Sequence, residues 1–197
     1  MEPSTTKLRR LLNGPDLVVA PGVVDALNAR LVAEAGFEAI YMTGAGTTAA
    51  RLGMPDVGLL TVTEMADNAG RIVDASGLPL ISDADTGYGS PVNVFRTVSL
   101  FEKAGAAGIH IEDQNWPKRC GHLAGKTLIP ANEMAAKINA ACDARNDKDF
   151  LIIARTDALA IDGLTAALDR AQLYEGAGAD VIFVESPRTT KEIKAIQ

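Results

Sequence analysis

The sequence has little of several residue types, and each shortage excludes a class of protein. It contains 2 cysteines in 197 residues, Cys120 and Cys142, which is too few for a disulfide scaffold and is typical of a reducing compartment. Basic residues are in the minority, 19 against 25 acidic ones, and the formal net charge of -6 argues against nucleic acid as the main partner. No apolar run approaches the roughly 20 residues that cross a bilayer, so we expect no membrane partner either.

The start of the chain and its composition predict an ordinary globular protein. The first residues, Met1–Arg10, lack the apolar core of a secretory signal, and we therefore expect a cytoplasmic protein. With 47% hydrophobic and 22% charged residues, the chain has enough apolar material for one large core, and we expect a single domain over residues 1–197. Because the net charge is negative, an anionic substrate would need cations or a metal placed locally.

Short apolar segments alternate with longer amphipathic ones along the chain. This alternation is typical of parallel βαβ units whose sheet is covered on both faces. We expect strands at Leu17–Ala20, Ala39–Met42, Leu80–Ala84, Gly108–Glu112, Phe150–Arg155 and Val181–Glu185. We expect helices at Val24–Ala35, Thr63–Ala75, Pro91–Ala104, Asn132–Arg145 and Thr165–Ala177. An Ala-Gly pair follows three of these helices, at 35–36, 104–105 and 177–178, where glycine ends a helix in the left-handed conformation.

Polar residues collect where the predicted strands end. In (β/α)8 TIM-type barrels the site lies at these carboxyl ends, and in a doubly wound sheet it lies there too, at one crevice. We favour the barrel because most of the strands contribute, through Thr43, Asp83, Asp85, Glu112, Arg155 and Glu185. A complete barrel takes about 250 residues. The sequence therefore predicts an α/β barrel that is truncated after about the sixth βα unit, either as a fragment or as a barrel closed by something other than its own chain.

Three carboxylates are expected to converge at the ends of adjacent strands. Asp83 and Asp85 are two residues apart and point to one side of a strand, and Glu112 ends the next strand. Acids this close repel each other unless a cation or protons intervene, and Mg²⁺ prefers such oxygen ligands. The alternative is that both aspartates cap the turn in Asp83–Gly89, which has good turn chemistry. Spacing alone leaves the two interpretations open.

The segment Lys118–His122 puts a thiol among basic side chains. Nearby cations favour the reactive thiolate, and Gly121 and Gly125 would let the loop close over a substrate. The alternative is a bystander cysteine in a charged surface loop. We expect Cys142, on an alanine-rich helix, to lie in the core.

Three further side chains on the predicted strands have two interpretations each. Arg155 suits bidentate capture of a carboxylate, or it forms an ion pair with Glu112 or Glu185. Tyr41 aims its hydroxyl up the barrel, or it fills the core. His110, inside an apolar strand, is expected to be an interior histidine with its polar atoms satisfied rather than a ligand.

Taken together, these segments resemble the isocitrate lyase/phosphoenolpyruvate mutase superfamily, and its 2-methylisocitrate lyase branch in particular. The resemblance runs from Ala20 to Glu185 and is carried by Tyr41–Gly46, Met54–Asp56, Ser82–Gly89, His110–Gln114, Lys118–His122 and Ala154–Ala158. It implies a (β/α)8 barrel that binds Mg²⁺, with Mn²⁺ as an alternative. It also implies a homo-oligomer, a tetramer in the family.

The resemblance assigns roles to individual residues. It implies that Asp83, Asp85 and Glu112 surround the metal and that Asp56 reaches it through water. It implies that the substrate is bound by Thr43, Gly44, Ala45, Gly121 and Arg155, where Ala45 replaces the glycine usual in the 2-methylisocitrate branch. The implied catalytic set is Cys120 as general acid on a mobile loop, with His122, Arg155, Tyr41 and Glu185.

The implied activity is a magnesium-dependent carbon–carbon lyase. It would cleave a small anionic 2-hydroxy di- or tricarboxylate such as 2-methylisocitrate by retro-aldol chemistry, to pyruvate or glyoxylate plus a carboxylate. Alternatives within the superfamily are an oxaloacetate hydrolase or decarboxylase, a 2,3-dimethylmalate lyase, and an enzyme of phosphorus–carbon bonds, against which Cys120 counts. An alternative of another class is a non-catalytic fragment or assembly partner.

Overall fold

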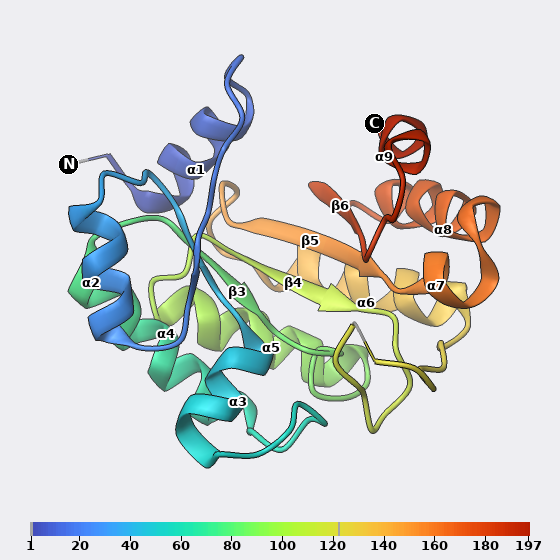
Figure 1. Ribbon diagram of the computed structural model, residues 1–197, viewed down its shortest axis with the longest axis horizontal. Helices are drawn as coiled ribbons and strands as arrows, with labels where there is room; N and C mark the ends of the chain where they lie inside the picture. The colour runs from blue at the N-terminus through green and yellow to red at the C-terminus, as the bar shows by residue number, and fades with distance from the viewer. Residues whose placement is uncertain (1, 122) are drawn as a thin grey trace.

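The computed structural model describes residues 2–121 and 123–197. Six parallel strands form one sheet in which each strand pairs with the next in chain order. They are β1 (Gly22–Val23), β2 (Ile40–Met42), β3 (Leu80–Asp83), β4 (Gly108–Glu112), β5 (Leu151–Thr156) and β6 (Val181–Val184) (Figure 1). Parallel strands in chain order, joined by helices, are the arrangement from which TIM-type barrels are built.

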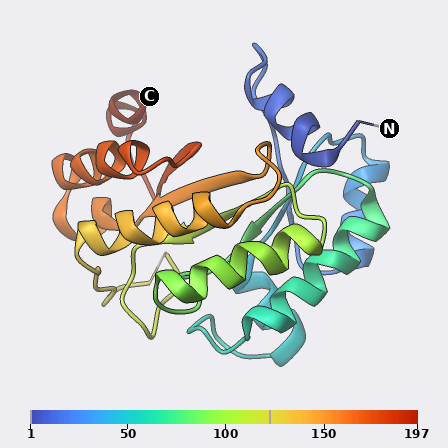
Figure 2. The same cartoon turned by 180° about the vertical axis from the view of Figure 1, so that it is seen from behind.

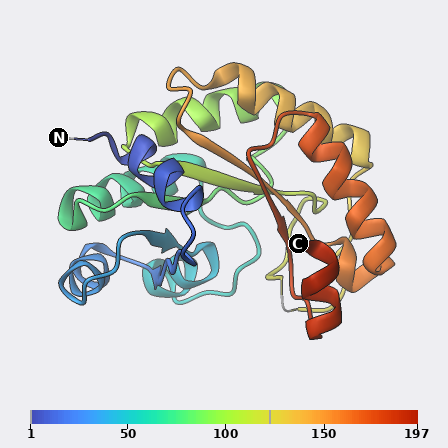
Figure 3. The ribbon, with the colours of Figure 1, turned by 90° about the horizontal axis from the view of Figure 1, so that it is seen from above.

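Helices surround the outer side of the curved sheet. Figure 2 shows α4, α5 and α6 lying across this side, and Figure 3 shows the helices continuing as an arc to α8. The helices are α1 (Ser4–Leu12), α2 (Ala26–Glu34), α3 (Gly44–Leu52), α4 (Val62–Ser76), α5 (Pro91–Lys103), α6 (Ala131–Ala144), α7 (Ala158–Asp162), α8 (Leu164–Gly176) and α9 (Thr190–Ile196). Within the described part of the chain, none of these helices has the length and apolar character that a membrane span requires.

One predicted strand is wrong. The segment Leu17–Ala20 is extended but unpaired, and β1 is Gly22–Val23 instead. The reason is that pairing with β2 starts at Pro21, whose carbonyl accepts the N–H of Tyr41 at 3.0 Å. Leu17 is 90% exposed, so the apolar character of that segment did not indicate a buried strand. The helices α1, α3 and α7 were not predicted.

Local sequence explains how the other elements begin and end. Thr61 and Glu64 form a reciprocal capping box at the start of α4, which satisfies two backbone N–H groups that the helix leaves free. The three Ala-Gly turns are as predicted: Gly36, Gly105 and Gly178 have φ values of 87°, 85° and 101°. Each lets the chain leave a helix and enter the next strand.

The alternation of side chains along the strands divides the core from the inner face. Ile109 and Ile111 of β4 pack outward with Phe101 of α5 and Ile138 of α6 in the main core cluster. Because successive side chains of a strand point to opposite faces, His110 and Glu112 of β4 face inward. Arg155 of β5 pairs in register with Glu112 and faces the same way. The fold therefore gathers charged residues inside the curve of the sheet.

Helix α1 covers the amino-terminal ends of the strands, opposite to the charged end. Leu8 is fully buried in a cluster with Ala39, Ala107 and Leu151, which lie at or just before strand starts. Arg9 donates to Asp180 Oδ1 at 2.7 Å, just before β6, and to the carbonyl of Asp149 at 3.0 Å, just before β5. These contacts attach α1 to the amino-terminal ends of the strands.

Candidate active site

Asp83 lies at the centre of the inner acid cluster and is held by backbone groups. Its Oδ2 accepts the N–H of Gly44 at 3.1 Å and its Oδ1 accepts the N–H of Asp85 at 2.9 Å. Burial alone would raise the pKa of Asp83, but its neighbours His110, Lys118 and Arg155 lower it. Of the two aspartates predicted to cap the turn, Asp83 does so among the described residues, while the Asp85 side chain pairs with Lys118. Asp83 remains an ionised carboxylate that faces the interior.

Asp85 and Glu112 lie next to each other behind Asp83. The N–H of Glu112 donates to the carbonyl of Asp85 at 2.8 Å, and both side chains are buried. Burial, reinforced by the charge of Asp83, raises the pKa of Asp85 to about 7. Burial also raises the pKa of Glu112 well above its ordinary value, and its buried Oε1 has no hydrogen-bond partner among the described residues. In their ionised forms, both buried carboxylates therefore need a positive charge beside them.

The cation that meets part of this demand is Lys118 of the thiol loop. Its Nζ lies 2.6 Å from Asp85 Oδ1 and also contacts Asp56 Oδ1, and its side chain is 2% exposed. Burial acts against the charged form, but Asp85, Asp83, Glu112 and Asp56 raise the pKa of Lys118. The sequence suggested that Lys118 acts on the neighbouring thiol, and the structure corrects this: the ammonium belongs to the acid cluster.

The donor set of the cluster fits a hard divalent cation. Within residues 2–121 and 123–197, no three His, Cys, Asp or Glu side chains lie close enough to form a ready-made metal site. Mg²⁺ and Mn²⁺ nevertheless take carboxylate oxygens as ligands. The cluster offers Oε1 of Glu112, which lacks a partner among the described residues, and the two carboxylates that Lys118 bridges. Bringing such an ion among them would require Lys118 to move.

Arg155 is held between acids on the inner face. Its Nε lies 3.1 Å from Asp157 Oδ2, its Nη1 lies 3.4 Å from Glu112, and its Nε lies 3.5 Å from Glu185. Burial opposes the charge, but these acids raise the pKa of Arg155, so the guanidinium stays cationic. The predicted ion pairs are confirmed, and Asp157, which the sequence did not single out as a partner, makes the shortest one.

Tyr41 and His110 form a stacked, hydrogen-bonded pair beside Asp83. The phenol oxygen lies 2.8 Å from His110 Nε2, and the ring centroids are 5.6 Å apart. Burial lowers the pKa of His110, so its ring is neutral at pH 7, and burial raises the pKa of Tyr41. The expectation of a satisfied interior histidine is correct for Nε2 and wrong for Nδ1, which is buried and has no hydrogen-bond partner in the part of the chain that the structure describes.

The predicted carboxylate-binding segment forms the amino terminus of α3. Thr43 is the N-cap, and its Oγ1 accepts the N–H of Gly46 at 3.2 Å. A Cβ at Gly44 would lie 2.5 Å from Asp83 Oδ2, so only glycine allows this close approach. N–H groups at a helix start favour anions. Here those of Gly44 and Gly46 donate to Asp83 and Thr43, and Thr43 and Ala45 line the interior cavity.

The thiol loop is anchored at both ends. Gln114 donates to the carbonyl of Arg119 at 2.9 Å and accepts its N–H at 3.0 Å. Lys126 donates to the carbonyl of Gly121 and lies 2.6 Å from Asp157 Oδ1. A Cβ at Gly121 would overlap Arg155 and Glu185, so the loop rests directly on the Arg155 group. His122 lies outside the described residues.

A cavity of about 1000 Å³ brings most of the predicted site residues together. Its polar lining comprises Tyr41, Thr43, Asp56, Asp83, His110, Cys120, Arg155 and Glu185, and Ala45 and Gly121 also contribute. Asp85, Glu112 and Gly44 do not line it and lie behind the first layer. Cys142, expected in the core, is only half-buried on α6, where its Sγ donates to the carbonyl of Gly178 at 3.1 Å.

Fold and cavity together define a class: an α/β barrel-type protein with acids, an arginine and a thiol at the carboxyl ends of its strands. The sequence profile of phosphoenolpyruvate phosphomutase matches residues 8–197. The chain therefore belongs to this family, within the phosphoenolpyruvate mutase/isocitrate lyase superfamily.

Named relatives include lyases. The chain is 52% identical over 193 residues to "2,3-dimethylmalate lyase" of Eubacterium barkeri, covering 98% of this chain and 67% of that protein. It is 50% identical over 187 residues to "2-methylisocitrate lyase" of Aeropyrum pernix, covering 95% of this chain and 60% of that protein. The chain thus spans about two thirds of the length of these relatives.

Solved structures of the superfamily have the same fold. A 2,3-dimethylmalate lyase matches with a TM-score of 0.95 at 44% identity, covering 100% of this chain and 66% of that one. An oxaloacetate acetylhydrolase in complex with 3,3-difluorooxalacetate matches with a TM-score of 0.94 at 45% identity, covering 98% and 67%. A phosphonopyruvate hydrolase complex with oxalate and Mg²⁺ matches with a TM-score of 0.88 at 36% identity, covering 99% and 68%. The predicted α/β TIM-type fold class is confirmed.

Proposed function

We propose that this chain carries the catalytic centre of a divalent-metal-dependent carbon–carbon lyase. Its substrate would be a 2-hydroxy di- or tricarboxylate, and its products a 2-oxoacid, pyruvate or glyoxylate, plus a second carboxylate. The observation that carries the proposal is that Cys120 lines the same cavity as Asp83, Arg155 and Glu185. In this proposal, a proton donor, a carboxylate-binding cation and metal-ligand oxygens would act around that one volume.

In this proposal the acid cluster holds the metal and the helix start holds the substrate. Asp83, Asp85 and Glu112 would take Mg²⁺ or Mn²⁺, with Asp56 reaching it through water. A bound ion of this kind lowers the pKa of a hydroxyl and stabilises negative charge on oxygen. The N–H group of Ala45, with Thr43, would bind the carboxylate of the 2-hydroxy acid end, while the N–H of Gly44 stays with Asp83 and lets α3 approach that carboxylate. Arg155 would bind the charge that develops on the other side.

The thiol completes the reaction. When the carbon–carbon bond breaks, the hydroxyl would pass its proton to the Glu185 carboxylate, which lines the same cavity, and become the carbonyl of the 2-oxoacid. The bonding electron pair would move to the carbon beside the second carboxylate. That carbon then takes a proton from the Cys120 thiol, which acts as the general acid. Before that proton arrives, the carbon and its carboxylate together carry two negative charges. Arg155 would stabilise this dianion, because its guanidinium stays charged and lies beside Gly121 of the loop.

A variant pair tests the role of the thiol. Cys120→Ala should abolish cleavage, with kcat lowered at least about a hundredfold, while Mg²⁺ affinity measured by calorimetry stays within twofold of the wild type. Cys142→Ala is the matched control, since that thiol lies on α6 outside the cavity, and it should retain activity. Wild-type turnover in Cys120→Ala would refute the assignment.

The substrate class is tested with 2-methylisocitrate, isocitrate, 2,3-dimethylmalate and oxaloacetate, each with Mg²⁺, by following 2-oxoacid formation or loss. The likeness to an oxaloacetate acetylhydrolase supports a second candidate, hydrolysis of oxaloacetate. Loss of oxaloacetate without cleavage of any hydroxy acid would favour that candidate. The homotetramer stays a prediction, which light scattering would test.

A further inference from the structure

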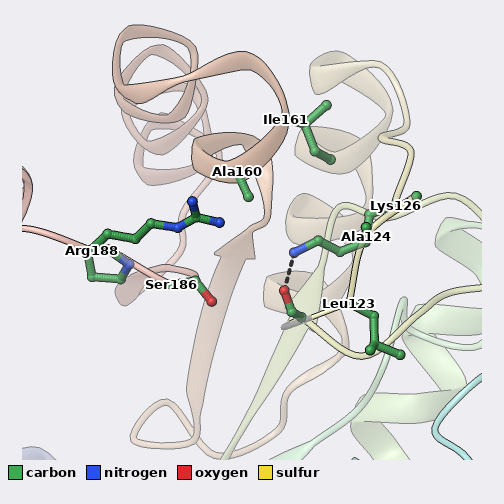
Figure 4. Close-up of a pocket in the computed structure, with 10 residues that line it drawn as sticks. Leu123, Ala124, Lys126, Ala160, Ile161, Ser186 and Arg188 are labelled. Atoms are coloured by element: carbon green, nitrogen blue, oxygen red, sulfur yellow. Dashed lines mark hydrogen bonds between the residues drawn. The ribbon is translucent and has the colours of Figure 1, made fainter.

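A second cavity lies on the far side of the thiol loop from the acid cluster. It has a volume of about 620 Å³ and lies between loop residues 121 and 123–126, helix α7 and the segment 186–188 that follows β6 (Figure 4). We call it the side chamber. Gly121 and Ser186 line both the side chamber and the main cavity. A ligand in the main cavity therefore borders the side chamber across these two residues.

The side chamber contains one cation that is not already paired. Lys126 donates to the carbonyl of Gly121 and pairs with Asp157 at 2.6 Å, so its charge is matched within the protein. Arg188 differs: within the described residues its guanidinium has neither a hydrogen bond nor an ion pair at 4 Å or less, although its charge contributes to lowering the pKa of Glu192. Figure 4 shows this guanidinium directed into the chamber, below Ala160 and towards the side on which Lys126 lies.

The backbone around Arg188 fixes where its charge is presented. Glu192 Oε2 accepts the N–H of Arg188 at 2.7 Å and that of Thr189 at 2.9 Å, so the nearby acid is engaged by the backbone. Ser186 has a φ of 56°, which is uncommon for a residue with a side chain. This turn lies between β6 and α9, and the exposed Arg188 that follows it lines the side chamber.

The remaining wall of the side chamber is apolar and small. Leu123 and Ala124 come from the thiol loop, and Ala160 and Ile161 from α7. An arginine at the end of a short apolar passage suits a carboxylate carried on an alkyl arm, because guanidinium binds a carboxylate through two parallel hydrogen bonds. The chamber would not increase the binding affinity of a dicarboxylate whose two carboxylates are both attached to the reacting carbons.

We infer that the side chamber receives the additional carboxylate arm of a tricarboxylate substrate and that Arg188 is its counter-ion. The inference rests on the proposed lyase function and narrows its substrate class to tricarboxylates. Arg188 would then determine specificity and contribute to substrate binding, while the chemistry stays with Cys120 and the acid cluster. Its removal should therefore raise KM and leave kcat nearly unchanged.

Steady-state kinetics of the full chain test this inference directly. Arg188→Gln should raise KM for 2-methylisocitrate or isocitrate at least about tenfold, and should change KM for 2,3-dimethylmalate by less than about twofold. Arg188→Lys should recover part of the loss. Lys191→Gln removes an exposed positive charge from α9 and is the matched control, which should change neither KM. Equal effects of Arg188→Gln on both substrate classes, or no effect on either, would overturn the inference.

A binding experiment separates this inference from the proposed function. Calorimetry with Mg²⁺ present would compare propane-1,2,3-tricarboxylate with butanedioate, neither of which can be cleaved. The wild type should bind the tricarboxylate more tightly, and Arg188→Gln should remove that difference. This result would support the side chamber even if no hydroxy acid were cleaved. A wild type that binds both probes equally would overturn the inference whatever the activity.

Discussion

At the scale of single residues, Lys118 links the thiol loop to the acid cluster. Its ammonium bridges Asp56 and Asp85 in a position with 2% exposure, and both carboxylates would otherwise be buried with unbalanced charge. A divalent cation entering the cluster needs the same oxygens. Lys118 and the metal are therefore expected to compete for these carboxylate oxygens. If the metal displaces the ammonium, the thiol loop that carries Lys118 should move away from the acid cluster.

Lys118→Met tests this competition. Without the ammonium, the variant should bind Mg²⁺ about tenfold more tightly, which corresponds to about 1.4 kcal/mol. It should also be less stable than the wild type in the absence of Mg²⁺, because two buried carboxylates lose their cation. Calorimetry gives the affinity, and thermal unfolding with and without Mg²⁺ gives the stability.

Lys137→Met is the matched control for that variant. Lys137 is another buried lysine, on α6, whose Nζ donates to the carbonyl of Thr86 at 3.0 Å and forms no ion pair within the described residues. Its replacement should leave Mg²⁺ affinity within about twofold. An unchanged affinity in Lys118→Met, or the same change in both variants, would show that the ammonium does not compete with the ion.

At the scale of elements, Asp113 fixes the exit of β4 and with it the start of the thiol loop. Its Oδ2 accepts from Thr156 at 2.7 Å, Tyr174 at 2.8 Å and Arg170 at 3.0 Å, and its Oδ1 accepts the N–H of Asp157 at 3.0 Å. These donors come from β5, the turn after it, and α8. Asp113 is fully buried, so it joins three elements by hydrogen bonds shielded from water.

Asp113→Asn should be strongly destabilising. The amide cannot accept at both former oxygen positions, and Arg170 loses its buried counter-ion, which together should cost about 3–5 kcal/mol. Urea unfolding measures the loss. Asp67→Asn is the control, since it breaks exposed pairs with Arg51 and Arg71 and should cost no more than about 1 kcal/mol. Similar losses in both variants would contradict the role given to Asp113.

The contrast between Glu112 and Asp113 shows how far the sequence could predict these elements. The alternation of apolar residues located β4 and placed Glu112 at its end, because that pattern depends on neighbours in the chain. It could not show that Asp113 binds Tyr174, 61 residues away, or that Lys118 binds Asp56, 62 residues away. Such pairs form only when the strands assemble, and short sequence patterns carry no signal for them. The strand predicted at Leu17–Ala20 was wrong for a related reason. The assembled fold decides whether an apolar segment is buried, and the sequence alone did not show that Leu17 is exposed.

At the scale of the whole molecule, the charged residues of the cavity lie at the carboxyl ends of the strands, and helix α1 packs at their amino-terminal ends. Leu8 and Arg9 of α1 tie the starts of β5 and β6 to the rest of the molecule. The strands that carry Arg155 and Phe183 are therefore anchored at the end remote from the chemistry. We expect the stability of the sheet, more than the geometry of the cavity, to depend on α1.

Leu8→Ala tests the contribution of α1. Leu8 is fully buried, so truncating it should destabilise the fold by about 2–5 kcal/mol through lost contacts and a new cavity. Leu12→Ala, on the same helix but 39% exposed, should cost clearly less. Chemical unfolding of both variants gives the comparison. A loss for Leu8→Ala no larger than for Leu12→Ala would mean that α1 does not hold the bottom of the sheet.

The burial of Lys118 has a practical consequence for following the protein in solution. An amine enclosed by two carboxylates is protonated and out of reach of acylating reagents, which attack the free base. Lys118 should therefore resist acetylation by acetic anhydride while exposed lysines such as Lys191 react. The rate at which its peptide acquires acetyl groups, read by mass spectrometry, would report how often the loop leaves the acids.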